Sequence, residues 1–336
     1  MIQQQNILDI LQEFNLNGNH IQYTPLTAGL INDTFLVTDD EKQQFILQRI
    51  NHIVFKNTGI LMDNINYALP YLTADDYAQI TFLPTKSGEN CLQINGDYWR
   101  IMTYIPDSTT YNTTTNTSTA FETGRIVGAF HSLLKKADVT LFKDTLPKFH
   151  HLDHRAQEFE EALATSEIQK REIAAKGIKK AHHFLKELEH LNNENLPVRI
   201  CHNDTKLNNI LFSKNSDKAL CLIDLDTIMK GYFYYDFGDE QNHDLIAFNS
   251  ELFEAFVDGL ATNESFLTEE EKQSLPLGAV FMPFIHGLRA LTDYLNNNTY
   301  YKVTYENQNL DRCLSLFNFA EKALAKKEMM AAYIQK

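Results

Sequence analysis

The spacing of hydrophobic residues changes near residue 106. Before it, short apolar runs such as Phe45–Ile50 and Tyr98–Ile105 alternate with polar turns, which predicts strands joined by hairpins. The opening residues and the stretch 52–80 follow helical spacing instead, so helices accompany these strands. From Ala120 onward, apolar residues recur at helical spacing. The pattern predicts an α+β fold, with an antiparallel sheet and a helix in a first lobe and a larger, mainly helical second lobe.

The boundary between the two parts is the polar, low-complexity stretch 107–119, DSTTYNTTTNTST. A chain of 336 residues exceeds what one hydrophobic core usually serves, so two lobes are expected on length as well. We predict an N-lobe at 1–106, a linker at 107–119 and a C-lobe at 120–336.

Within the helical part, residues 199–240 have a different pattern. The polar cluster HNDTKLNN lies between two apolar runs, which predicts a strand, a tight loop and a second strand. A further apolar run, Ala219–Ile223, is typical of a buried strand and ends in Asp224-Leu225-Asp226. Side chains two apart on a strand point the same way, so we expect both carboxylates to face one site.

With Asp204 of the polar cluster, three carboxylates would then lie close together. Two unit charges about 4 Å apart repel by roughly 4 kcal/mol at an effective dielectric constant near 20, and a divalent cation removes that cost. Asp224 and the amide oxygen of Asn209, with Asp226 available, are hard ligands that suit Mg²⁺ or Mn²⁺ rather than zinc. Because Mg²⁺ usually also binds phosphate oxygens, the cluster indicates a phosphorylated substrate.

The polar cluster also carries a specific motif. HNDTKLNN resembles the catalytic loop HRDxKxxN of the protein-kinase-like superfamily, with His202, Asp204, Lys206 and Asn209 at matching offsets, and Asp224 stands where those kinases have their metal-binding Asp. Together with IDLDT and YDFGD, it is most similar to the aminoglycoside phosphotransferase-like small-molecule kinases, and among them to N-acetylhexosamine 1-kinases. The resemblance covers most of the chain and implies a protein-kinase-like two-lobe fold.

The resemblance implies a role for each matched residue. Asp204 would accept or orient the proton of the acceptor hydroxyl, and Lys206 would neutralise charge on the transferred phosphoryl group. Asn209 and Asp224 would hold Mg²⁺, with ATP as the phosphoryl donor and a hexosamine (GlcNAc or GalNAc) as the acceptor. His202 and Asp236 would hold the catalytic loop in place rather than contact the substrate.

The N-lobe would bind the nucleotide. The loop 28–34, with Asn32, Asp33 and Thr34, would cover the ATP phosphates, and the backbone around Thr103 and Tyr104 would receive adenine. The strand 45–50 departs from the kinase pattern, because the position of the usual lysine offers Gln48 or Arg49. Arg49 is the candidate cation, but strand alternation leaves open which of the two faces inward.

The acceptor pocket would lie near the C-terminal helices. The segment GLRALTDYL and the residues after it resemble the sugar pocket of hexosamine 1-kinases, which implies that Arg289 and Tyr300 bind sugar hydroxyls beside Asp204 and Asp226. A structural Arg289, held in a salt bridge, is the alternative.

Composition limits the partners. The formal net charge is −14, from 44 acidic and 30 basic residues, which argues against binding to nucleic acid or to an anionic membrane. The four cysteines are far apart and form no CxxC pair, which favours reduced thiols and a cytoplasmic protein. We expect no secretory signal and no membrane helix. The sequence makes no prediction of oligomeric state.

Three alternatives remain open. The acceptor could be another small hydroxyl compound, such as an aminoglycoside, choline, homoserine or methylthioribose. The DLD segment could be the metal site of a nucleotide-sugar glycosyltransferase, which would need a Rossmann-like half before it. A kinase-fold binding protein without catalysis is the third, because the N-lobe lysine is missing.

Overall fold

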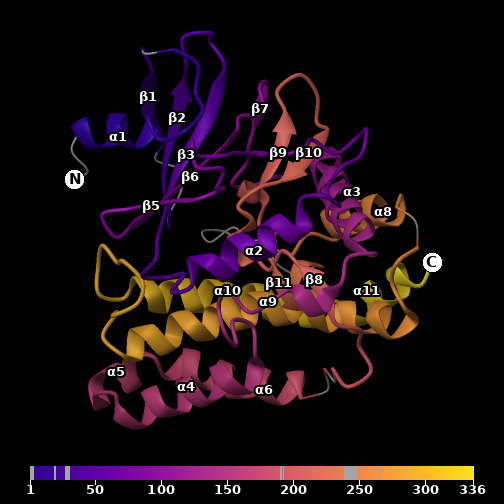
Figure 1. Ribbon diagram of the computed structural model, residues 1–336. Helices are drawn as coiled ribbons and strands as arrows, with labels where there is room; N and C mark the ends of the chain where they lie inside the picture. Colours follow the sequence, from indigo (N-terminus) through magenta and orange to yellow (C-terminus); the bar gives the residue numbers. More distant parts are fainter. Residues whose placement is uncertain are drawn as a thin grey trace.

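An antiparallel sheet forms the N-lobe. The computed structural model describes residues 4–18, 20–26, 31–189, 191, 193–237, 248–263 and 265–336, and Figure 1 shows this sheet above a mainly helical lobe. Its strand order is β1-β2-β3-β6-β4, with β5 paired to β6. The strands are β1 (Gln22–Leu26), β2 (Asp33–Thr38), β3 (Gln44–Ile50), β4 (Phe82–Leu83), β5 (Leu92–Ile94) and β6 (Asp97–Thr103). The predicted α+β class and the antiparallel N-terminal sheet are confirmed.

Both faces of this sheet are covered by helices. Helix α1 (Gln4–Leu11) lies on one face, where it shares a core with Leu47 and Trp99. Helix α2 (Thr58–Ala68) shares a core with Ile50 on the other face, the one that also meets the C-lobe. The side chain of Asn57 caps α2 by accepting a hydrogen bond from the backbone N–H of Ile60 at 3.1 Å.

The connection between the lobes is more ordered than a linker. β7 (Ser108–Thr109) pairs with a C-lobe strand, and α3 begins at Thr117 rather than at Ala120. Asn116 caps α3 by accepting from the backbone N–H of Ser118 at 2.8 Å. Residues 108–109 and 116–119 of the low-complexity stretch therefore belong to the C-lobe.

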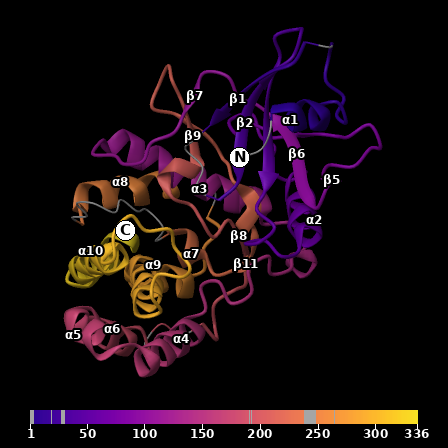
Figure 2. The same ribbon diagram turned by 90° about the vertical axis from the view of Figure 1, so that its left-hand side faces the viewer.

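Helix α9 (Glu269–Leu295) is the centre of the C-lobe. It lies between α10 and the layer formed by α4 to α6, as Figures 1 and 2 show. Contrary to our expectation, α9 is long and apolar enough to cross a membrane, but 83% of its most apolar window is buried, as in a core helix. The other helices are α3 (Thr117–Leu134), α4 (Leu152–Thr165), α5 (Ile168–Ile173), α6 (Ala175–Leu188), α7 (Phe233–Phe237), α8 (Ser250–Ala261), α10 (Gln308–Leu324) and α11 (Lys327–Ile334).

Two helix boundaries differ from the sequence pattern. Residues 310–333 have a continuous helical pattern but form two helices that separate at Ala325 and Lys326, and Met330 of the second is fully buried. The helical pattern of the sequence starts at Leu245, whereas α8 begins at Ser250, after the cap Asn249; residues 245–247 lie outside the described residues.

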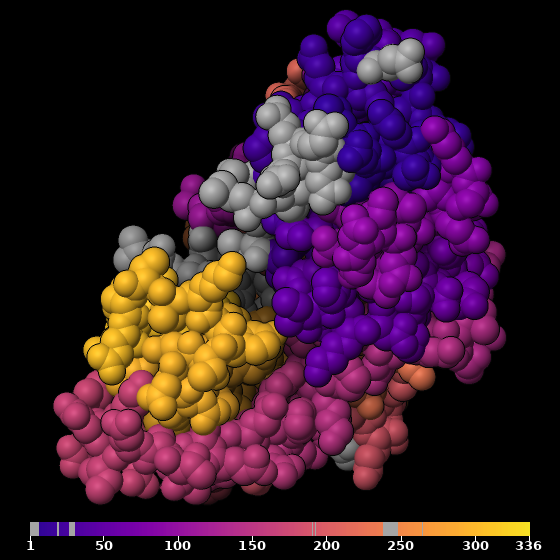
Figure 3. Space-filling view, turned by 60° about the vertical axis from the view of Figure 1, so that its left-hand side comes forward, coloured from indigo at the N-terminus to yellow at the C-terminus, as the bar shows by residue number. Residues whose placement is uncertain are grey.

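Small sheets bring the motif segments together near the junction of the lobes. β8 (Arg199–Cys201) pairs with β11 (Met229–Gly231), while β9 (Ile210–Ser213) pairs with β10 (Ala219–Leu222) and β7. Single 3-10 turns occupy Val139–Leu141, Leu207–Asn209 and Leu225–Thr227. The backbone N–H of Ile223 donates to the carbonyl of Asn209 at 2.8 Å, so the polar loop and the DLD segment are neighbours. In the space-filling view, the N-lobe and the C-terminal residues lie next to each other on one face of the molecule (Figure 3).

Candidate active site

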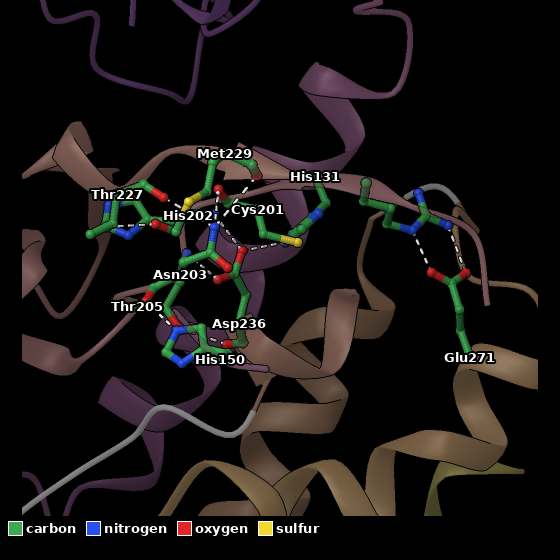
Figure 4. Close-up of polar contacts among 11 residues, drawn as sticks. His131, His150, Cys201, His202, Asn203, Thr205, Thr227, Met229, Asp236 and Glu271 are labelled. Atoms are coloured by element: carbon green, nitrogen blue, oxygen red, sulfur yellow. Dashed lines mark hydrogen bonds and ion pairs between the residues drawn. The ribbon is translucent and has the colours of Figure 1, made fainter. Parts of the chain in front are cut away.

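A buried carboxylate holds the polar loop in position. Asp236 of α7 accepts hydrogen bonds from the backbone N–H groups of His202 at 2.7 Å and Asn203 at 2.6 Å, and Nε2 of His131 lies 2.9 Å away (Figure 4). Burial alone would raise the pKa of Asp236, but His131 and His202 hold it below its usual value. The loop is therefore anchored immediately before Asp204.

The same loop is tied to the DLD segment. Asn203, at φ 64°, donates from Nδ2 to the carbonyls of Cys201 and Thr227, each at 3.0 Å. The hydroxyl of Thr227 donates to the carbonyl of His202 at 2.8 Å, and the His202 ring contacts the carbonyl of Ile223 at 2.8 Å. Figure 4 shows these side chains in one network, in which His202 has the structural position that the resemblance implies.

Cys201, His131 and Asp236 have ligand atoms within 4.8 Å of one another. They do not form a metal centre here, because the Asp236 carboxylate already accepts three hydrogen bonds. The cluster therefore belongs to the scaffold of the loop.

Asp204 has one occupied and one open oxygen. Its Oδ2 accepts from Lys206 Nζ and from Asn209 Nδ2, both at 2.8 Å. Within the described ranges, Oδ1 has no hydrogen-bond donor, and the side chain is 20% exposed. The carboxylate is thus fixed through one oxygen while the other can accept a proton from a bound hydroxyl group.

Asp224 does not continue strand β10. Its backbone is left-handed, with φ 60° and ψ 56°, and a 3-10 turn follows it. The strand alternation that we expected for Asp224 and Asp226 is therefore wrong, and the two side chains have different surroundings. A left-handed non-glycine residue carries strain, which is often found at functional sites.

The surroundings of Asp224 fit a cation. Burial and the nearby carboxylates of Asp226 and Asp204 raise the pKa of Asp224 to about 7. Within the part of the chain that the structure describes, no donor binds its carboxylate. Because Asn209 uses Nδ2 to bind Asp204, its Oδ1 is the atom left for a metal. These two oxygen groups are hard ligands of the kind that Mg²⁺ prefers.

Asp226 is not in an acceptor pocket. It is 2% exposed, and its Oδ1 lies 2.6 Å from Nη2 of Arg100, an ionic contact outside hydrogen-bonding geometry. Asn32 Nδ2 donates to its Oδ2 at 2.7 Å. The substrate-binding role that we expected for Asp226 does not fit this placement, because both oxygens face the N-lobe.

The structure answers the question of strand alternation in β3. Gln48 Oε1 accepts from Nη2 of Arg100 at 2.8 Å, so Gln48 faces the C-lobe. Arg49 lies on the opposite face, where Nε donates to Asp33 at 2.8 Å and Nη1 reaches Asp97 at 3.4 Å. The expected phosphate-binding roles of Arg49 and Asp33 do not fit, because they bind each other away from the cleft.

The other nucleotide-binding candidates have mixed surroundings. Thr34 accepts a long hydrogen bond from Gln48 at 3.4 Å, and residues 28–30 of the expected phosphate loop lie outside the described residues. Thr103 and Tyr104 lie at the end of β6, where the chain leaves the N-lobe. Their N–H groups donate to Thr81 at 2.9 Å and Gln44 at 3.4 Å, so adenine would need other groups of this segment.

Arg289 and Tyr300 are brought together. The Arg289 guanidinium lies over the rings of Phe149, at 4.9 Å, and Tyr300, at 5.8 Å, and its Nη2 is 3.5 Å from the Tyr300 hydroxyl. Asp293 orders the following loop by accepting from the N–H groups of Tyr300 at 2.7 Å and Tyr301 at 3.0 Å. No carboxylate among the described residues pairs with Arg289.

His150 lies between Phe149, over which the Arg289 guanidinium is placed, and the catalytic loop, and it carried no signal in the sequence. It is 3% exposed, its Nε2 lies 3.0 Å from the carbonyl of Asn203, and its ring is 4.2 Å from that of Phe149. Burial lowers the pKa of His150 to about 4, so the ring is neutral near pH 7. Arg100 is the other residue that the motifs missed, and only the register of β3 and β6 could have indicated it.

Comparison with known proteins identifies one family. The model of the phosphotransferase enzyme family matches residues 22–271, from β1 to the start of α9. The match includes the polar loop, the DLD segment and the N-lobe sheet.

Solved structures share the whole fold at low sequence identity. A microcompartment-associated aminopropanol kinase is 16% identical with a TM-score of 0.69, covering 96% of this chain and 98% of that one. A spectinomycin phosphotransferase bound to ADP and spectinomycin is 11% identical with a TM-score of 0.68, covering 97% and 99%. A choline kinase from Cryptosporidium parvum Iowa II is 14% identical with a TM-score of 0.60, covering 99% and 98%.

Proposed function

Because the chain belongs to the phosphotransferase enzyme family, we propose that it transfers the γ-phosphoryl group of ATP to the anomeric hydroxyl of an N-acetylhexosamine. The product would be GlcNAc 1-phosphate or GalNAc 1-phosphate. The observation that carries the proposal is the Asp204 carboxylate, which is fixed by Lys206 and Asn209 through one oxygen and open at the other.

In this mechanism the open oxygen of Asp204 accepts the proton of the sugar hydroxyl as its oxygen attacks phosphorus. Lys206, whose Nζ lies 2.8 Å from the other oxygen, brings positive charge to the phosphoryl group. Asp224 and Asn209 would hold Mg²⁺, which when bound would neutralise the phosphate oxygens. His150 and Asp236 keep the loop from shifting during the reaction.

Two guanidinium groups support a neutral acceptor over a cationic one. Beside Arg289, Arg312 of α10 lies over the Tyr301 ring at 4.8 Å, and the Tyr300 and Tyr301 rings are 4.8 Å apart. Burial and the charge of Arg289 lower the pKa of Arg312. Neither guanidinium pairs with a carboxylate in the described ranges, so they would repel an amine and bind hydroxyl or acetamido oxygens.

The alternatives are weaker. Aminopropanol, ethanolamine and choline kinases share the fold, so an amine acceptor is the second candidate, and the −14 net charge would favour it. Charges beyond about 8 Å are screened at physiological salt, so the arginines in the pocket outweigh the overall charge. A glycosyltransferase would need a parallel sheet before the DLD segment, whereas the N-lobe sheet is antiparallel. We place the enzyme in the cytoplasm, in keeping with its free cysteines, and expect no nucleic-acid partner.

A coupled assay of ADP release tests the proposal. Purified protein with Mg²⁺ and ATP is offered GlcNAc, GalNAc, choline, ethanolamine and an aminoglycoside. We expect turnover with a hexosamine and none with the amines. Release of ADP with the amines alone would show that the acceptor is an amine and not a hexosamine, while the proposed mechanism of transfer would stand.

Replacement of Asp204 tests the mechanism itself. Asp204→Ala should lower kcat by about 10²- to 10⁴-fold, because the proton acceptor is lost, while calorimetry still detects binding of ATP with Mg²⁺. Asp217→Ala, the same change at an exposed C-lobe position, is the matched control and should keep full turnover. Unchanged turnover of Asp204→Ala would remove this residue from the mechanism.

A further inference from the structure

The face of β3 that meets the C-lobe has no charged side chain. The register pairs Thr34 of β2 with Gln48 of β3, and Gln48 with Arg100 of β6, so these three side chains share that face. Gln48 is neutral, but its Oε1 accepts from Arg100 Nε at 3.0 Å and Nη2 at 2.8 Å. A positive charge therefore reaches this position from the neighbouring strand.

Several elements fix the guanidinium of Arg100. Besides Gln48, it contacts Met62 of α2, with Nη1 3.8 Å from Sδ, and lies 5.7 Å from the ring centroid of Phe82 in β4. It is 1% exposed, and Nη2 lies 2.6 Å from Asp226 of the C-lobe. A side chain held in this way has one orientation, and that orientation is set by the N-lobe.

The partner of Arg100 belongs to the turn that carries Asp224. On the N-lobe side, Asp226 is bound by Arg100 and by Asn32 Nδ2 at 2.7 Å. On the C-lobe side, the hydroxyl of Thr227 binds the carbonyl of His202 at 2.8 Å. Asp224, whose backbone is left-handed, lies just before Asp226 and Thr227, which contact the N-lobe and the C-lobe. The direction of its carboxylate therefore depends on both lobes.

A buried ion pair is seldom explained by stability. Removing two charges from water costs free energy, and replacing such a pair by apolar residues of similar volume is often neutral or stabilising. Arg100 and Asp226 are both buried and come from different lobes. Their position next to a metal-binding turn indicates that they orient it, as outer partners of a metal site commonly do.

We propose that Arg100 is a positioning residue for nucleotide and metal binding. From β6 it supplies the positive charge that β3 lacks at Gln48, and through Asp226 it holds the turn that carries Asp224. The inference rests on the proposed function, because the role of Asp224 as a Mg²⁺ ligand belongs to the proposed transfer of a phosphoryl group from ATP.

The test measures how much Mg²⁺ strengthens nucleotide binding. Calorimetry gives the Kd of AMP-PNP in Mg²⁺ and in EDTA, and their ratio is the Mg²⁺ enhancement, which does not depend on the acceptor. Arg100→Met should lower this ratio about 10- to 100-fold, the usual effect of losing an outer partner of a metal site. Arg100→Met with Gln48→Lys should restore most of it, because the ammonium group would stand beside Asp226.

Two further variants separate positioning from folding. Arg100→Met with Asp226→Met replaces the pair by apolar residues and should fold well, yet keep the low ratio. Arg199→Met removes another largely buried pair, with Glu271, in which Nη2 and Oε2 are 2.7 Å apart, and should lose stability but keep the wild-type ratio.

A wild-type ratio in the apolar-pair variant would overturn the inference, because the ion pair would then be structural only. Failure of Gln48→Lys to restore the ratio in a folded protein would also overturn it, because the charge would not be what matters. If the wild type shows the enhancement but phosphorylates no hexosamine, the acceptor assignment fails while the role of Arg100 stands.

Discussion

The anchoring of the catalytic loop by Asp236 can be tested with one substitution. Asp236→Asn keeps the size of the side chain but replaces one acceptor oxygen by an NH₂ group. Three donors converge on the carboxylate, from His131, His202 and Asn203, at 2.6 to 2.9 Å. The amide can accept on one side only, so at least one buried donor must face another donor.

The expected cost follows from burial. Hydrogen bonds to a charged group contribute about 1.5–3 kcal/mol, and breaking a buried charged pair costs about 3–5 kcal/mol. Asp236 is 2% exposed, so water cannot replace the lost acceptor. With an unfolding entropy of about 2.1 cal/mol/K per residue, 336 residues give about 0.7 kcal/mol/K, and Tm should fall by about 4–7 °C.

Calorimetry and turnover measure the two consequences. Because Asp236 binds the N–H groups just before Asp204, we expect kcat to fall together with Tm. Asp75→Asn is the matched control, since Asp75 is exposed and has no partner within the described ranges. It should change the free energy of unfolding by less than about 0.5 kcal/mol. A Tm and a kcat of Asp236→Asn equal to those of the wild type would refute the anchoring role.

Two further predictions concern the acceptor pocket and pH. Arg289→Ala should raise KM for the sugar about 10- to 100-fold and leave KM for ATP nearly unchanged, because a charged hydrogen-bond donor to the acceptor is lost, whereas equal effects on both would indicate a structural residue. His150 has a folded-state pKa of about 4 against 6.5 when unfolded, so the stability it contributes is present above pH 6.5 and is lost as pH falls toward 4, by about 1.4 kcal/mol per pH unit. Chemical denaturation of His150→Gln should therefore show a flatter decline between pH 6 and 5 than the wild type, while the exposed His183→Gln should not. The raised pKa of Asp224 makes its contribution to the free energy of unfolding increase as pH falls, but this contribution is the same in all three proteins. If the free energy of unfolding falls with pH equally steeply in His150→Gln and in the wild type, the role of His150 is contradicted.

The sequence predicted the parts of the site that are local in the chain. Asp204, Lys206 and Asn209 lie within one short loop, so their offsets alone bring them together, and the structure joins them through one carboxylate oxygen. The antiparallel N-lobe and the helical C-lobe followed from the periods of the apolar residues. The sequence also placed Arg289 and Tyr300 in one site, and the structure brings them together because they lie on either side of the C-terminal end of α9.

The sequence could not settle which face of β3 meets the cleft. Helices cover both faces of the sheet, so Leu47 on one face and Ile50 on the other are both fully buried. The strand therefore lacks the alternation of apolar and polar residues that would show which face is exposed to solvent. The pair of Arg100 and Asp226 joins two lobes and depends on strand register, which no local pattern contains.

The conformation of Asp224 was also outside what a pattern could predict. An apolar run that ends in DLD predicts a continued strand, but the chain turns at a left-handed residue instead. Asp tolerates this conformation more readily than most residues, yet only the contacts of Asp226 and Thr227 select it.

We propose that this enzyme phosphorylates the anomeric hydroxyl of an N-acetylhexosamine. The most direct measurement is ³¹P NMR of the product formed from ATP, Mg²⁺ and GlcNAc or GalNAc. We expect a new phosphomonoester signal coupled to the anomeric proton of the sugar, and none with the Asp204→Ala protein. A phosphorus signal coupled to another sugar proton, or found only with an amine acceptor, would contradict it.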